Sequence, residues 1–293
     1  MRNPLSKNVI IRNRIVSAIL FAFTVCYIVL APMHFMNGVS ADPYRDFFLP
    51  EVEPSVGVIK VWHIVSFKPF SGSLGNWLKD KAKRYSSRYV NVYFQVTSMT
   101  KNEALEQLAR GEAPDVLSFV CGSESRDSFR EFILPDSGNE PAAAVPYCAS
   151  GYLLVCDPNA LAEKELAVVM SEAGTPNEFK SGKAAACVCD VRGAADLLRA
   201  QLNGKCPFFT AEPIDGENDL VQCIGIFGEI DEGKLAYAVG YIGSLLTESA
   251  QSSLAQIGLL PVDKNCSPEY DIDWMKKLWE SFDPDSIPPF FCG

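Results

Sequence analysis

The sequence contains few of the residues that catalysis and metal binding require. It has only two histidines, His34 and His63, and none of its ten cysteines forms a CxxC pair. It also lacks the HExxH, GxSxG and P-loop patterns of common enzyme classes. We therefore predict no metal, no cofactor, no catalytic residue and no enzymatic activity. Only a pair of glycosidase carboxylates stays open, because spacing in sequence does not report spacing in the fold.

Acidic residues are absent before Asp42, and residues 15–35 carry no charge at all. This run of 21 residues has about the length of a membrane-spanning helix. The four basic residues that precede it predict an N-terminus in the cytoplasm and a main domain outside. We expect residues 1–41 to be an uncleaved anchor, with a cleaved signal ending at Ala41 or a lipid on Cys26 as alternatives. The protein is thus predicted at the cell membrane, or secreted or lipid-anchored if it is processed.

The remainder of the chain is acidic. Removing the four basic residues of the first 41 from the 26 in the chain leaves 22 against 36 acidic residues, a net charge of −14. A surface of this sign repels phosphate backbones, so we predict no nucleic-acid partner. Nine cysteines remain outside the uncharged run, an odd number, and several lie in apolar runs where cysteine behaves as a small hydrophobe. Most of these thiols are therefore expected to be buried and free.

Hydrophobic periodicity predicts strands that alternate with helices. The helix expected at residues 101–110 has a capping box formed by Thr100 and Glu103 and ends at Gly111. Further helices are expected at residues 74–85, 161–173, 194–202, 234–246, 248–257 and 274–279. Strands are expected within residues 58–63, 90–96, 116–120, 151–156, 181–189 and 220–227. Residues 141–147 and 211–216 are interpreted as two crossovers between lobes. This alternation predicts an α/β fold with mostly parallel sheets.

Several short motifs occur in a recognisable order across residues 58–262. They are Val61-Trp62-His63, Gly111-Glu-Ala-Pro114-Asp115-Val, Ser150-Gly151-Tyr152-Leu-Leu-Val, Gly182-Lys183-Ala-Ala-Ala and Gly258-Leu-Leu-Pro261-Val262. This ordered set resembles the extracellular, periplasmic-type solute-binding proteins of ABC transporters, in particular the sugar-binding members. The resemblance implies a two-lobe periplasmic-binding-protein-like fold that follows the N-terminal segment. Its expected parts are a linker (42–57), lobe I (58–145 and 213–265), lobe II (146–212) and a C-terminal tail (266–293).

In such a fold the solute lies between the lobes, near the carboxyl ends of strands. Trp62 is suited to stack on a sugar ring or to fill the core, and His63 to donate to a ligand or to play a structural role. Asp190 and Arg192 are suited to bind hydroxyl groups, or to form an ion pair and cap a helix. The predicted ligand-binding residues are Trp62, His63, Ser66, Lys68, Gly122, Ser123, Tyr147, Ser150, Asp190 and Arg192.

The function implied by the resemblance is capture of a small polar solute, with carbohydrate as the expected class. The expected partners are that solute, an ABC permease in the membrane, and the membrane itself through the N-terminal segment. The second lobe is short, and this leaves an alternative open. In that alternative, a membrane-tethered sensor or protein-interaction module uses a reduced solute-binding fold.

Overall fold

The computed structural model describes residues 57–120, 143–159, 165–214, 220–228, 230–283 and 290–291. The chain divides into two compact units, Met1–Pro54 and Ser55–Gly293, and all the described residues belong to the second. Within this unit the described strands form two sheets, one of six strands and one of three.

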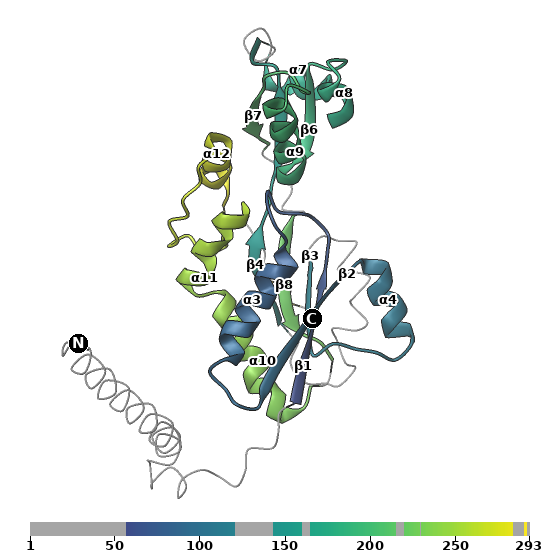
Figure 1. The fold of residues 1–293 in the computed structure, drawn as a ribbon, viewed down its shortest axis with the longest axis vertical. Coiled ribbons are helices and arrows are strands. Elements are labelled where there is room, and N and C mark those ends of the chain that lie inside the picture. Colours follow the sequence, from purple (N-terminus) through teal and green to yellow (C-terminus); the bar gives the residue numbers. More distant parts are fainter. Residues whose placement is uncertain are drawn as a thin grey trace, which may run out of the picture. The chain divides into compact units, whose positions relative to one another are not determined.

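The larger sheet has the strand order β2-β1-β3-β8-β4-β9. Its strands are β1 (Gly57–Ile64), β2 (Val92–Met99), β3 (Val116–Val120), β4 (Ala143–Ala149), β8 (Val221–Ile226) and β9 (Phe290–Phe291). Helices α3 (Leu74–Ser86) and α10 (Glu232–Leu245) pack on one face, against side chains such as Ile59. Helix α4 (Lys101–Ala109) packs on the other face (Figure 1), where Ala104 belongs to the same buried apolar cluster as Trp62 and Leu117. Alternation along β1 therefore supplies two separate cores.

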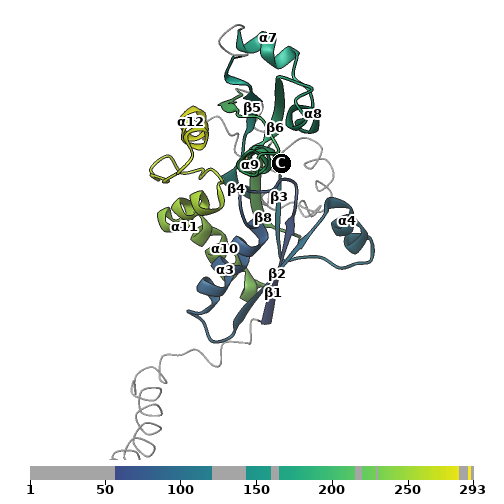
Figure 2. The same ribbon diagram turned by 45° about the horizontal axis from the view of Figure 1, so that its top comes forward.

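The smaller sheet has the order β6-β5-β7, and both pairings are antiparallel. Its strands are β5 (Tyr152–Cys156), β6 (Ala186–Asp190) and β7 (Thr210–Pro213). Its helices are α7 (Leu166–Ser171), α8 (Pro176–Lys180) and α9 (Val191–Leu202). The chain enters this sheet after β4 and returns to the larger sheet at β8 (Figure 2). The two connections meet where the Ser150 N–H donates to the Leu220 carbonyl, at 3.0 Å.

The predicted α/β two-lobe architecture is confirmed, but the expectation of mostly parallel sheets is wrong. Strand β1 is parallel to β2 and β3, whereas every pairing of β8, β4 and β9 is antiparallel. The two segments interpreted as crossovers are also largely strands, β4 and β7. Pro146 suggested a break, yet it lies at a register shift in β4, where a proline without an N–H is tolerated. Strand β4 thus keeps the chain in the larger sheet as far as Ala149.

The C-terminal segment contributes to the core. The helix expected near residues 274–279 is present as α12 (Asp273–Ser281). Its side chains Trp274, Met275 and Leu278 are buried in the apolar cluster that contains Leu153 and Val155 of the smaller sheet. The part of the chain expected as a tail is therefore packed against the body of the domain.

Local signals set several helix ends. The capping box of α4 is confirmed: the Thr100 hydroxyl accepts from the Glu103 N–H at 3.3 Å, and the Thr100 N–H donates to the Glu103 carboxylate at 2.7 Å. Helix α11 (Glu248–Ser252) continues as the 3-10 helix η1 (Ser253–Ile257). It stops at Gly258, which has the left-handed φ of 69° that glycine adopts at low cost. The predicted stop at Gly258 is thus confirmed.

The membrane prediction falls on residues 15–35, outside the described part of the chain. Within the described ranges, no helix is long and apolar enough to span a bilayer. Six of the described cysteines are free, and five of those six are buried. Cys223, by contrast, is disulfide-bonded. The expectation of mostly free thiols therefore holds for the described part of the chain, with Cys223 as the exception.

Candidate functional site

A buried polar network lies where β1 and β3 end, the edge at which the sequence placed the site. The Ser118 hydroxyl is its centre, 3.2 Å from His63 Nδ1 and 2.9 Å from the Tyr147 hydroxyl. The Gln222 side-chain amide donates to the same hydroxyl at 3.0 Å and to the Ile64 carbonyl at 3.3 Å. All four side chains of the network are buried. They tie β1, β3, β4 and β8 together through hydrogen bonds.

Burial keeps this network uncharged. Desolvation lowers the pKa of His63 from 6.5 to about 4, so the imidazole is neutral at physiological pH. Desolvation also raises the pKa of Tyr147 well above its usual range. Two buried oxygens near the network, Ser150 Oγ and Gln222 Oε1, have no hydrogen-bond partner among the described residues. The network is thus neutral and almost complete in itself.

The remaining predicted residues are dispersed. Trp62 is 5% exposed and belongs to the core, while Ser66 and Lys68 are exposed on the loop between β1 and α3. Asp190 caps α9 by accepting from the Gly193 N–H at 2.7 Å. Arg192 forms its ion pair with Asp196, at 3.4 Å. Gly122 and Ser123 lie outside the described residues. Among the described residues of the predicted set, hydrogen bonds therefore join only His63 and Tyr147, through Ser118.

The unpartnered hydroxyl of Ser150 permits a direct test of its role. We expect Ser150→Ala to raise the free energy of unfolding by about 1 kcal/mol, because it removes a buried polar group that lacks a hydrogen bond. The matched variant Ser118→Ala should lower it by about 1–3 kcal/mol, because three polar groups lose a partner. Urea denaturation of both variants measures the difference. A loss of stability in Ser150→Ala would show that this hydroxyl is bonded after all.

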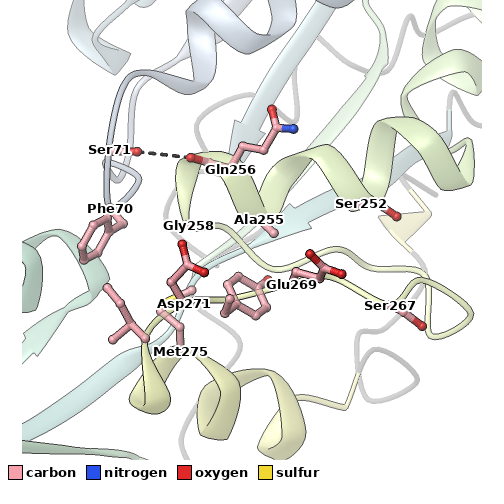
Figure 3. A pocket seen from close by; sticks show the side chains of 12 residues that line it. Phe70, Ser71, Ser252, Ala255, Gln256, Gly258, Ser267, Glu269, Asp271 and Met275 are labelled. Atoms are coloured by element: carbon pink, nitrogen blue, oxygen red, sulfur yellow. Dashed lines mark hydrogen bonds between the residues drawn. The ribbon is translucent and has the colours of Figure 1, made fainter.

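A cavity of about 500 Å³ lies elsewhere, beside the loop that joins β1 to α3. Phe70 and Ser71 of this loop form one wall, and Ser252, Ala255, Gln256 and Gly258 of the α11–η1 region form the second. The segment that leads into α12 forms the third, with Ser267, Glu269, Tyr270, Asp271, Ile272 and Met275. In Figure 3 the side chains of Phe70, Asp271 and Met275 gather at one end, and those of Ser252, Glu269 and Ser267 at the other.

Backbone geometry holds the first two walls together. The Ser71 N–H donates to the Ile257 carbonyl at 3.2 Å, and its hydroxyl donates to the Gln256 carbonyl at 3.3 Å (Figure 3). Gly258 makes this close approach possible, since a Cβ atom at that position would lie 2.3 Å from Phe70 Cβ. The cavity therefore depends on a glycine at the end of η1.

The third wall is fixed by a buried hydroxyl and by aromatic contact. The Tyr270 hydroxyl donates to the Leu259 carbonyl at 2.7 Å, and the Trp274 ring lies 5.9 Å from the Phe70 ring. Arg199 of α9 donates to the Phe70 carbonyl at 2.8 Å and lies over the Phe70 ring at 5.9 Å. The loop at Phe70 thus joins elements of the larger sheet to α9 of the smaller one.

The lining combines an apolar surface with polar side chains. Phe70, Tyr270 and Met275 supply apolar area, and Glu269 and Asp271 supply exposed carboxylates. Neither carboxylate forms a hydrogen bond or ion pair with another described residue. Mixed linings of this kind are typical of ligand sites. Among the described residues, no cluster of three histidine, cysteine or acidic side chains is placed to hold a metal ion.

A second cavity, of about 580 Å³, is lined by β6 and by the α7–α8 region. Its lining has three acidic side chains, Asp157, Glu172 and Glu178, one basic side chain, Lys183, and no aromatic side chain. Glu178 is already engaged in the capping box of α8. We therefore take the cavity at Phe70 as the candidate site.

Sequence reasoning missed this cavity because half of its lining comes from the segment interpreted as a tail. Tyr270, Trp274 and Leu278 recur every four residues, the spacing of one helix face. This periodicity is typical of a helix packed on a core, and it was the signal in the sequence that could have placed residues 270–278 against the domain.

Many solved structures resemble this fold, including the following three. The maltodextrin binding protein MalE1 from L. casei BL23 is 14% identical, with a TM-score of 0.52 over 80% of this chain and 86% of that one. An oligosaccharide periplasmic-binding protein from Synechococcus sp. MITs9220, in complex with zinc, is 10% identical, with a TM-score of 0.53 over 76% and 84%. A cyclo/maltodextrin-binding protein complexed with maltotetraose is 14% identical, with a TM-score of 0.51 over 80% and 88%.

No protein-family model and no curated protein matches the chain. The structural similarity confirms the fold that the motifs implied: this chain has the two-lobe fold of periplasmic solute-binding proteins. At these identities the similarity concerns the fold alone.

Proposed function

We propose that this protein is the extracytoplasmic solute-binding component of an ABC importer. It captures a small polar solute, a carbohydrate, in the cavity at Phe70 and presents it to a permease. The observation that carries the proposal is this cavity of about 500 Å³, which lies in a fold similar to those of two maltodextrin-binding proteins.

The lining suits a carbohydrate. The hydroxyl groups of a sugar need hydrogen-bond partners, and Ser252, Glu269 and Asp271 offer them around the cavity. The apolar face of a pyranose needs a flat apolar surface, which the Phe70 ring offers. A volume of about 500 Å³ lies within the usual range of ligand pockets.

Solute capture by this fold also requires movement. The chain passes from the larger sheet to the smaller one between β4 and β5, so bending at residues 150–151 changes the distance between the sheets. The Arg199 contact with the Phe70 carbonyl links α9 to the cavity wall. Closure of the lobes therefore acts directly on the cavity.

The remaining parts of the proposal concern location. Residues 15–35 anchor the protein as a single N-terminal helix in the cell membrane, with the main domain outside. The uncharged run and the four basic residues before it support this arrangement. The expected partner in the membrane is the permease.

A thermal-shift screen of the full chain in detergent tests the function. It uses neutral and amine-bearing oligosaccharides, amino acids, peptides and inorganic anions. A solute at a hundred times its Kd should stabilise the folded state by about 2.7 kcal/mol. Titration calorimetry then compares Glu269→Gln and Asp271→Asn with wild type. We expect each to weaken binding by about 10-fold or more, because a charged hydrogen bond is lost.

The matched control is Asp273→Asn, which removes the same charge two residues from Asp271. Asp273 pairs with Lys276 at 3.5 Å and does not line the cavity. Its affinity should equal that of wild type. A folded protein that no probe stabilises would contradict the proposal and favour the tethered sensor or interaction module.

A further inference from the structure

The carboxylates of the cavity are left without counter-ions, although basic side chains occur on the elements around it. Lys276 pairs with Asp273 at 3.5 Å, Lys277 with Glu212 at 2.6 Å, and Lys264 with Asp283 at 2.8 Å. Glu269 and Asp271 have no such partner among the described residues, and no basic side chain lines the cavity.

The nearest cation of α9 is also engaged. Arg199 donates to Asp196 on its own helix and to the carbonyl of Phe70, which lines the cavity. It therefore holds the loop in place and is not available to neutralise Glu269 or Asp271. The two exposed carboxylates line the same open cavity, and neither has a counter-ion among the described residues.

We propose that the cavity selects a solute that carries a protonated amine, such as a sugar with an amino group. This inference rests on the proposed function and names the solute class for the same cavity. An ammonium group has three N–H donors and a positive charge, so it forms charged hydrogen bonds with a carboxylate that lines the cavity. A neutral sugar satisfies the hydrogen bonds of the carboxylates but leaves the like charges in place.

The rest of the molecule favours the same class. The acidic balance of residues 42–293 attracts cations toward the domain and repels anionic solutes. The aromatic ring of Phe70 and the thioether of Met275 accommodate the carbon skeleton that carries the amine. Phosphorylated or carboxylated solutes are excluded by the same two carboxylates.

The test compares three tetrasaccharides by titration calorimetry with the full chain in detergent. They are tetra-glucosamine, its fully N-acetylated form, and maltotetraose. Acetylation removes the positive charge and keeps the ring, and maltotetraose carries hydroxyl groups throughout. We expect tetra-glucosamine to bind at least about 10-fold more tightly than either neutral tetramer. This advantage should shrink between about 20 mM and about 300 mM salt, because screening weakens the attraction.

Three outcomes are distinguishable. If the double variant Glu269→Gln and Asp271→Asn abolishes the preference for the amine while Asp273→Asn retains it, the inference is supported. If a neutral tetramer binds as tightly as tetra-glucosamine and the double variant weakens it, the proposed function stands and the amine selectivity is overturned. If no tetramer binds to the folded protein, both the selectivity and the carbohydrate assignment fail.

Discussion

Replacing Gly258 with alanine is expected to destabilise the protein by about 2–6 kcal/mol and to abolish solute binding. Two separate costs add. The φ of 69° at this position is left-handed, and a residue with a Cβ atom pays about 1–3 kcal/mol to adopt it. The new Cβ atom would also lie 2.3 Å from Phe70 Cβ, and relieving such an overlap costs about 1–3 kcal/mol. Because Phe70 must shift, the wall of the cavity is displaced.

The variant Gly182→Ala separates the two costs. Gly182 has almost the same φ, 71°, but a Cβ atom there meets nothing within 4 Å. It should therefore lose only the backbone contribution and retain full solute affinity. Urea denaturation and calorimetry of both variants measure the difference. Equal losses of stability, with binding intact in Gly258→Ala, would mean that Phe70 moves aside without consequence for the cavity.

The second large effect is a dependence of stability on pH that arises from His63. Its pKa is 6.5 when unfolded and about 4 in the fold, because burial disfavours the imidazolium. Between these values the unfolded chain binds more protons than the folded one, so unfolding becomes easier as the pH falls. The contribution of His63 is complete above pH 6.5 and is lost progressively toward pH 4. At 1.36 kcal/mol per pKa unit, the loss is roughly 3 kcal/mol.

The variant His63→Gln isolates this contribution. Glutamine is neutral throughout the range and retains an N–H donor and an oxygen acceptor at this position. The hydrogen bonds of the capping boxes lower the pKa values of Glu103 and Glu178. The stability that these two carboxylates contribute is therefore lost in acid to the same extent in both proteins. The free energy of unfolding should thus fall more steeply from pH 7 to pH 4.5 in wild type than in the variant. Parallel profiles would show that His63 is accessible to water or has an acidic partner.

Local sequence signals predicted most elements of the fold, but none of the predicted ligand-binding residues that the structure describes lines the cavity. Helix α4 was predicted from Thr100 and Glu103, whose side chains act within one turn, and the end of η1 was predicted from Gly258. The strand β4 was missed because Pro146 ordinarily interrupts a ladder, and only the pairing with β8 shows that it lies at a register shift. Trp62 and His63 were placed on the correct strand, but whether they face a solute or a core depends on the helices above the sheet.

The sequence by itself determined the type and order of the elements, the capping of the helices and the ordered motifs of a two-lobe fold. These features follow from periodicity and from contacts between residues a few positions apart. The tertiary structure alone decided the antiparallel half of the larger sheet, the burial of the Ser118 network and the cavity. Phe70, Gly258 and Asp271 come from three distant parts of the chain but line one cavity. The conformational preferences of each segment do not determine which distant segments it contacts. Their positions follow from the packing of α11, η1 and α12 around one loop, which only the assembled core enforces.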